Sequence, residues 1–153
     1  MRENKQHNST AFEMGQRLTL FNESYRQSPY QDSSNQKYLT IGIGRNLDTV
    51  GISFDEAVYL QANDLRKACD FLAANVPWYI NMSDARQAVF IDMVFNLGGR
   101  GFLTFKKMLE ACKTEKYDVA ADELCDSRYC DQVGLRALRN ATILRTGVFP
   151  SLS

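Results

Sequence analysis

Residues 20–44 read LFNESYRQSPYQDSSNQKYLTIGIG, and this stretch decides how the N-terminal third of the chain folds. Residues 11–24 lead into it with large apolar side chains at roughly helical spacing, which predicts a helix that ends near Glu23. Turn-forming serine, proline, aspartate and asparagine residues follow, and the β-prone run 38–43 comes after them. The stretch therefore predicts a helix followed by a small antiparallel sheet.

Downstream of this stretch, the apolar pattern becomes that of long helices. Ser53 and Glu56 have the spacing of a capping box, and apolar side chains then recur every three or four residues, which predicts a helix over 54–74. Ser83 is placed to cap a second helix, 84–97, which is apolar nearly all the way round, as in the middle of a helical core. A cluster of glycines interrupts the chain, and shorter helices are predicted at about 102–112, 116–126 and 134–145.

These elements predict an α+β fold, mainly helical, with a small antiparallel sheet, a long connecting helix, a C-terminal helical bundle and a cleft between two lobes. At 153 residues the chain is long enough to bury a core and short enough that we expect a single domain over 1–153. The expected parts of this domain are a sheet lobe (25–53), a connecting helix (54–74) and a helical lobe (10–24 with 75–148).

Charge and hydropathy exclude several classes of partner. The formal net charge is zero, whereas proteins that bind nucleic acid usually carry a basic excess, so no nucleic-acid partner is expected. A polar N-terminus, with no apolar run of about 18 residues anywhere, predicts a chain without signal peptide or membrane insertion. Local basic groups form either a solvated helix face or a small polyanion-binding patch: Lys106, Lys107, Arg136 and Arg139.

The cysteines and the single histidine do not form a metal-binding pattern. Cys69, Cys112, Cys125 and Cys130 include no CxxC pair, and only His7 is available to complete a zinc site. A chain made in the cytoplasm normally keeps its thiols reduced. We therefore expect small core thiols, no disulfide, no metal and no cofactor.

Two carboxylates and a hydroxyl in or beside the opening stretch fit the chemistry of a glycosidase. Hydrolysis of a glycosidic bond needs an acid that protonates the leaving oxygen, and a second polar group that manages water or positive charge on the opposite face. Glu23 at the helix end and Asp32 in the following loop meet this need, and Thr40 on the next strand offers a hydroxyl for the water. A glutamate and an aspartate nine residues apart are common by chance. Whether they form a glycosidase site therefore depends on the residues around them.

Those surrounding residues resemble the phage-type lysozymes, the muramidase endolysins of glycoside hydrolase family 24, over about residues 12–148. LFNE at 20–23 is similar to the family's helix that ends in its catalytic glutamate. YQD at 30–32 is similar to the loop with its catalytic aspartate, and YLTIGIG at 38–44 to the strand with its water-binding threonine. Further similar strings follow in the family's order: DMVFNLG at 92–98, GF at 101–102 and LRTG at 144–147.

The resemblance implies a lysozyme-like fold and a monomeric enzyme that cuts the β-1,4 bond between N-acetylmuramic acid and N-acetylglucosamine in bacterial peptidoglycan. In family terms Glu23 is the general acid, Asp32 assists the water or the developing cation, and Thr40 positions the water. The family's outcome is inversion at the anomeric carbon. The sequence alone does not give the separation of the two carboxyls, which decides between inversion and retention on physical grounds.

The resemblance also implies residues that bind the substrate. Arg136 matches the arginine that pairs with the catalytic glutamate, and Asn46, Phe95 and Phe105 fall where the family lines its sugar-binding cleft. On the residues alone, Arg136 is also explained as a surface arginine of a helix. Phe95 and Phe105 are explained equally well as core aromatics.

The chain departs from the family pattern at two places. Arg45 stands where many members have a histidine that pairs with a carboxylate, and this pair is structural in those relatives. Seven residues separate Asp32 from Thr40, where the best-known members have five. The longer turn leaves open whether Asp32 keeps its place relative to Thr40.

Other functions fit the same residues. A lytic transglycosylase would need only Glu23 and would form an anhydro-sugar, and a phage component that lost activity would bind peptidoglycan without cleaving it. The polar N-terminus favours an endolysin that is held in the host cytoplasm. A holin-type pore would then release it onto the peptidoglycan of the periplasm.

Overall fold

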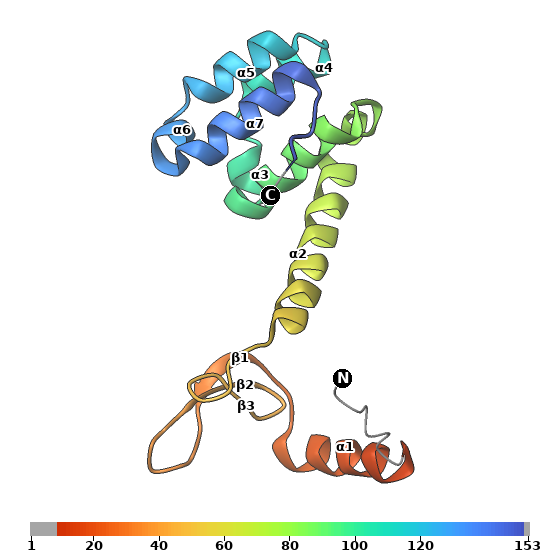
Figure 1. The fold of residues 1–153 in the computed structure, drawn as a ribbon, viewed down its shortest axis with the longest axis vertical. Helices are drawn as coiled ribbons and strands as arrows, with labels where there is room; N and C mark the ends of the chain where they lie inside the picture. The colour runs from red at the N-terminus through yellow and green to blue at the C-terminus, as the bar shows by residue number, and fades with distance from the viewer. Residues whose placement is uncertain (1–8, 152–153) are drawn as a thin grey trace. The chain divides into compact units, whose positions relative to one another are not determined.

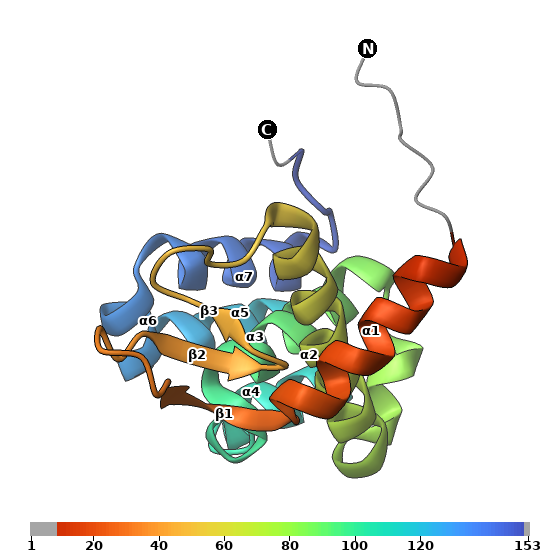
Figure 2. The ribbon, with the colours of Figure 1, turned by 90° about the horizontal axis from the view of Figure 1, so that it is seen from below.

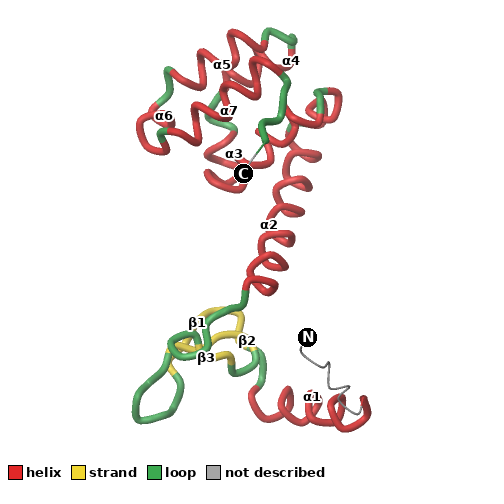
Figure 3. The backbone as a smooth tube through the Cα atoms, in the orientation of Figure 1, coloured by secondary structure: helices red, strands yellow, loops and turns green. Residues whose placement is uncertain are grey.

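The computed structural model describes residues 9–151, in which helices predominate and the strands lie between residues 26 and 46 (Figure 1, Figure 3). The elements follow the predicted order of a helix, a small sheet, a long helix and a group of shorter helices. They are α1 (Ser9–Glu23), β1 (Arg26–Gln31), β2 (Leu39–Gly42), β3 (Arg45–Asn46), α2 (Phe54–Asn75), the 3-10 helix η1 (Pro77–Asn81), α3 (Asp84–Phe102), α4 (Lys106–Lys113), α5 (Tyr117–Cys125), α6 (Arg128–Val133) and α7 (Leu135–Thr146). The predicted α+β class is confirmed.

The chain forms two compact units, Met1–Ala57 and Val58–Ser153. The first unit contains α1, the sheet and the first turn of α2, and α2 then continues into the second unit, which contains all the later helices. The predicted grouping of residues 10–24 with the C-terminal helices stays a prediction.

The sheet has three antiparallel strands in the order β1-β2-β3, so β2 is the central strand (Figure 2). The sequence predicted turns in the segment that forms β1, because this segment contains Ser28 and Pro29. Proline has no N–H to donate and is tolerated in an edge strand or at a bulge. Both conditions hold in this sheet, since β1 lies at the edge and its register with β2 shifts between Arg26 and Tyr30.

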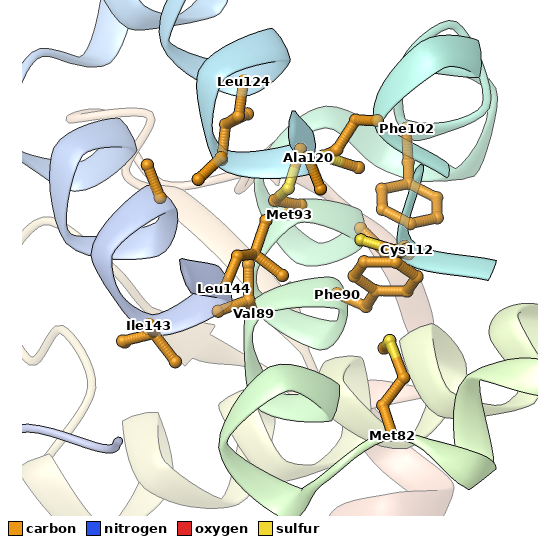
Figure 4. Packing of buried hydrophobic residues seen from close by; sticks show 14 of the residues in the cluster. Met82, Val89, Phe90, Met93, Phe102, Cys112, Ala120, Leu124, Ile143 and Leu144 are labelled. Atoms are coloured by element: carbon orange, nitrogen blue, oxygen red, sulfur yellow. The ribbon is translucent and has the colours of Figure 1, made fainter. Parts of the chain in front are cut away.

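Helix α3 forms the core of the second unit, as its all-round apolar sequence predicted. Its Phe90 and Phe102 are fully buried, and their ring centroids lie 5.0 Å apart at an interplanar angle of 67°. Trp78 of η1 meets Phe90 edge-on at 5.9 Å and packs against the core. Figure 4 shows side chains of α3, α5 and α7 converging around these rings, among them the fully buried Leu144.

Helix α3 extends to Phe102, but its regular helical backbone breaks at Gly98, directly after the predicted helix end at 97. Gly98 has φ 70° and ψ 162°, a non-helical conformation that glycine adopts without steric cost. Two helical segments therefore meet at a kink at Gly98, and the predicted interruption at the glycine cluster is confirmed. Among the described residues no single helix is long and apolar enough to cross a membrane, and the pair α3 and α4, bent by 117°, passes this test by length and composition only.

Arg86 joins three helices of the second unit. Its Nε donates to the Leu144 carbonyl oxygen at 2.8 Å, and its guanidinium lies 3.6 Å from the centroid of the Tyr117 ring. Gly147 caps α7 with φ 69°. A Cβ at Gly147 would also lie 3.0 Å from Cζ of Arg86, so both backbone conformation and space favour glycine there.

The cysteines fit a packing role. Cys112 is fully buried, and burial raises the pKa of its thiol to about 12, so it stays protonated. Cys69, Cys125 and Cys130 are half-buried, and all four thiols are free.

Candidate active site

Glu23 is the last residue of α1, and the helix ends there because Ser24 adopts a positive φ of 59°. The Ser24 N–H donates to the Leu20 carbonyl oxygen at 3.2 Å and closes the last turn. The Glu23 side chain lies against the hairpin turn between β2 and β3, where its Oε2 is 2.9 Å from the position that a Cβ on Gly44 would occupy. The helix end thus places a carboxylate directly against the sheet.

The hairpin turn needs its two glycines for different reasons. Gly42 has φ 69° and Gly44 has φ 70°, both in the left-handed region that disfavours side chains. A Cβ on Gly42 would meet nothing within 4 Å, whereas a Cβ on Gly44 would press on Oε2, Cδ and Cγ of Glu23. Gly42 therefore serves the turn alone, and Gly44 also makes room for the carboxylate.

Thr40 lies in a row of three side chains across the sheet. It pairs with Tyr30 on β1 and with Asn46 on β3, and directly opposed residues of an antiparallel sheet point to the same face. Thr40 is only 4% exposed, and its hydroxyl donates to the Tyr38 carbonyl oxygen at 3.2 Å. This bond orients the hydroxyl so that its oxygen lone pairs remain available as acceptors.

Asp32 keeps its register with Thr40 despite the longer turn. Its backbone N–H donates to the Tyr38 carbonyl oxygen at 2.9 Å, so the β1-β2 pairing continues one residue past Gln31. Because side chains alternate along a strand, Asp32 falls on the same face as Tyr30 and lies diagonally from Thr40. The extra residues are accommodated in the loop 33–37.

The Asp32 carboxylate is held by Ser34. The Ser34 N–H donates to Asp32 Oδ1 at 3.1 Å, and the Ser34 hydroxyl donates to the same oxygen at 2.6 Å. This local arrangement is typical of aspartate in turns. It fixes the carboxylate through Oδ1, and no described bond engages Oδ2.

The side chain of Asn46 is partly engaged by the turn that follows β3. Its Oδ1 accepts a hydrogen bond from the Thr49 N–H at 2.9 Å, which leaves its side-chain NH₂ for another partner. The row of Tyr30, Thr40 and Asn46, with Asp32 beside it, can therefore offer both donors and acceptors on one face.

Within residues 9–151, no three His, Cys, Asp or Glu side chains come together as a metal site would require.

We expect Gly44→Ala to displace Glu23 and to strain the turn. The left-handed φ should cost about 1 kcal/mol of unfolding free energy, and the shift of the carboxylate should lower wall-lytic activity by about tenfold or more. The matched control is Gly42→Ala, which carries the same backbone strain without the contact. Rates of wall clearing and urea unfolding of both variants test this, and equal losses of activity in the two would contradict a role for the contact.

Arg136 lies in the second unit, where it forms an ion pair with Asp92. Its Nε donates to Asp92 Oδ2 at 3.0 Å and its Nη2 to Oδ1 at 2.7 Å, and the Asn140 NH₂ group adds a bond to Oδ2 at 2.8 Å. Burial acts to raise the pKa of Asp92, but these hydrogen bonds and the charge of Arg136 outweigh it and hold the pKa below its ordinary value. Arg136 is half-buried and paired with Asp92, so it is not a solvent-exposed arginine of a helix surface. Its pairing with Glu23 stays a prediction.

Asp92 should make stability depend on pH. A carboxyl whose folded pKa is lowered stabilises the fold above its ordinary value of 3.8 and loses this contribution as the pH falls through the folded pKa. We expect Asp92→Asn to unfold at lower urea than the native protein at pH 6, with a gap that narrows below pH 4. Asp70→Asn, at an exposed position on α2, is the control, and a gap that does not change between pH 6 and pH 3 would contradict the assignment.

Phe95 and Phe105 also lie in the second unit and differ from each other. Phe95 is 45% exposed and borders a groove of 760 Å³ that Asp92 and Arg136 also line. Phe105 is half-buried and meets the Tyr129 ring edge-on at 5.7 Å, yet it borders a groove of 620 Å³ as well. Phe105 is thus largely a packing residue and Phe95 is not, and sugar binding by either stays a prediction.

Sequence reasoning assigned no role to Asp92 in the second unit or to Gly44 in the first, although each has a structural role within its own unit. It quoted Asp92 only as part of a similar string, although a carboxylate in an otherwise apolar helix predicts a buried partner. Arg136 and Asn140, four residues apart on α7, were the signal for that partner, since such residues share a helix face. The contact of Gly44 with Glu23 carried no comparable signal.

Two comparisons with known proteins bear on the identity of the chain. A curated relative from Dictyostelium discoideum, named "Probable T4-type lysozyme 1", is 30% identical over 99 residues, which make up 63% of this chain and 58% of that protein. The chain therefore spans less than two thirds of the length of this relative. The family model described as "Phage lysozyme" matches residues 21–145, which include Glu23, Asp32, Thr40 and Arg136. The chain belongs to the phage lysozyme family.

Proposed function

We propose that this chain is a glycoside hydrolase that cuts the β-1,4 bond between N-acetylmuramic acid and N-acetylglucosamine in peptidoglycan. One observation carries the proposal. A carboxylate at the end of α1 lies against the β2-β3 turn, and the same sheet presents Thr40 of β2 and Asp32, next to the end of β1, on one face. Family membership supports the same chemistry.

In the proposed mechanism Glu23 protonates the glycosidic oxygen as the bond to the anomeric carbon breaks. A water molecule donates one hydrogen bond to the Thr40 hydroxyl oxygen and one to Asp32 Oδ2, the oxygen that Ser34 does not engage. Asp32 stabilises the cationic carbon and accepts the proton of the attacking water. A water held on the face opposite to the leaving group gives inversion at the anomeric carbon.

We assign substrate binding to Asn46, Phe95, Phe105 and Arg136. The free NH₂ of Asn46 suits a sugar hydroxyl or an N-acetyl oxygen, and the exposed ring of Phe95 suits the apolar face of a sugar. Arg136 already neutralises Asp92, so we expect it to contribute a hydrogen-bonded guanidinium to the substrate site, with much of its charge offset.

The first test uses Gram-negative cell walls whose outer membrane has been permeabilised. Native protein should clear the suspension and release soluble fragments that carry new reducing ends. A competing function is that of a non-catalytic wall-binding component. Co-sedimentation of the protein with the walls, without any release of fragments, would support that function and overturn ours.

We further propose a role as an endolysin that acts as a monomer and reaches the periplasm through a holin-type pore. Expression in a Gram-negative host should then leave cells intact until a holin is co-expressed, and lysis should follow promptly. Lysis of equal speed without the pore would contradict this route, and a stable dimer in sedimentation would contradict the monomer.

A further inference from the structure

Arg45 begins β3, beside the turn that Glu23 contacts. It pairs with Ile41, so its side chain lies on the face of the sheet opposite to Thr40 and Asn46. There its Nη1 donates to the Gly51 carbonyl oxygen at 3.3 Å, and its Nη2 forms an ion pair with Glu56 Oε1 in the first turn of α2. One guanidinium therefore joins the strand, the following loop and the start of a helix.

Glu56 is itself fixed by the predicted capping box, which the structure confirms. The Ser53 N–H donates to Glu56 Oε2 at 2.7 Å, and the Glu56 N–H donates to the Ser53 hydroxyl at 3.2 Å. The Ser53 N–H and the charge of Arg45 outweigh burial and lower the pKa of Glu56, so the carboxylate is charged at neutral pH. Both of its oxygens are engaged, one by the helix cap and one by Arg45.

Gly44 connects this arrangement to the proposed acid. The Glu23 carboxylate lies against Gly44, and Arg45 is the next residue along the chain. The Gly44–Arg45 backbone is thus fixed from one side by the pairing of Arg45 with Ile41 and from the other by the bonds of the Arg45 side chain. A turn held in this way forms a rigid wall for the Glu23 side chain.

We propose that Arg45, held by Glu56 and Gly51, is a positioning residue that fixes the hairpin turn against which Glu23 rests. This inference depends on the proposed role of Glu23 as the acid. The effect is mechanical, because the described side-chain bonds of Arg45 go to Gly51 and Glu56, on the face of the sheet opposite to Thr40.

The solvent exposure of the Arg45–Glu56 ion pair distinguishes a positioning role from a contribution to global stability. The side chains of Arg45 and Glu56 are 39% and 40% exposed, and ion pairs at this exposure contribute little to global stability. A small displacement of a catalytic group, by contrast, costs activity steeply. Loss of the pair should therefore lower the turnover number much more than it lowers the temperature of unfolding.

The test compares Arg45→Met, Glu56→Gln and the double variant in the full chain. Gln at position 56 keeps a capping box with Ser53 while removing the charge. We expect each single variant to lower kcat on soluble peptidoglycan fragments about tenfold, with KM changed less than about twofold and the thermal midpoint by no more than about 2 °C. The double variant should lose no more than either single one, because both remove the same pair.

Arg17→Met on α1 is the matched control for loss of an arginine in the same unit, and it should keep native kcat. Arg45→Lys should be intermediate, because an ammonium group reaches one acceptor where the guanidinium reaches two. Additive losses in the double variant, or a change confined to KM, would overturn the proposal.

Amide hydrogen exchange distinguishes failure of this inference from failure of the proposed function. Arg45→Met should speed exchange of the Gly44 and Arg45 amides about tenfold relative to Arg17→Met, whether or not the protein cleaves walls. If the native protein proves inactive but Arg45→Met still shows the faster exchange, the catalytic role of Glu23 is rejected and the fixed turn is supported. Unchanged exchange in Arg45→Met would reject the positioning role itself.

Discussion

Glu23→Gln is expected to clear cell walls at least about 100-fold more slowly than the native protein, because an amide cannot donate the proton that the leaving oxygen needs. The side chain keeps its shape, so the contact with Gly44 and the fold should persist. The measurement is the initial rate of turbidity loss of permeabilised Gram-negative walls, with circular dichroism to verify folding.

Two further variants separate the acid from the groups that hold the water. Asp32→Asn and Thr40→Val should each slow clearing by about tenfold or more, since each removes one of the two proposed contacts to the water. Neither should match the loss in Glu23→Gln if protonation of the leaving group dominates. Native rates in Glu23→Gln would rule out the acid, and native rates in Asp32→Asn would show that the water is held without it.

Phe90→Ala is expected to cost about 3–5 kcal/mol of unfolding free energy, because it empties the centre of the core in the second unit. Phe90 has no exposed surface, and its ring packs edge-on against Trp78 and Phe102. Domains of this size are stable by only about 5–15 kcal/mol, so the variant should be close to its folding limit. Urea unfolding followed by circular dichroism gives the value.

Phe95→Ala is the matched control for this loss, since Phe95 lies five residues along the same helix and is 45% exposed. It should cost about 1 kcal/mol or less, because nearly half of its surface is already in water. Phe90→Leu, which refills much of the cavity, should fall between the two and remains measurable if Phe90→Ala does not fold. Equal losses for Phe90→Ala and Phe95→Ala would contradict the position of α3 at the core.

The sequence predicted elements well where local signals agreed with each other. The capping box at Ser53 and Glu56 located the start of α2, and the apolar sequence of residues 84–97 predicted the burial of α3. It failed where a residue is tolerated only because of tertiary context. Pro29 reads as a turn former and lies in an edge strand, a placement that depends on pairing with a distant segment.

The 3-10 helix after α2 and helix α6 were also missed. Both are short, at five and six residues, which is too few for apolar periodicity to stand out from a turn. At Gly98 the helical backbone does break where the glycine cluster predicted an interruption, and a short second helical segment follows within α3.

The candidate site was predictable as a set of residues and less so as a set of contacts. Glu23, Asp32 and Thr40 were selected from their surrounding strings, and their roles stay predictions. The bond from the Asp32 N–H to the Tyr38 carbonyl oxygen shows that the longer turn leaves the β1-β2 pairing intact up to Asp32. The partners of Arg45 and Arg136 were not found, because an arginine in a sequence does not indicate which carboxylate it will reach. Those pairs are set by the sheet register and by helix packing.

The most direct test of the central claim is mass spectrometry of the products from purified peptidoglycan digested in ¹⁸O-labelled water. A lysozyme should yield muropeptides with a reducing N-acetylmuramic acid that carries one ¹⁸O, and Glu23→Gln should yield almost none. Anhydro-sugars without ¹⁸O would identify a lytic transglycosylase and contradict the proposed roles of Asp32, Thr40 and the water between them.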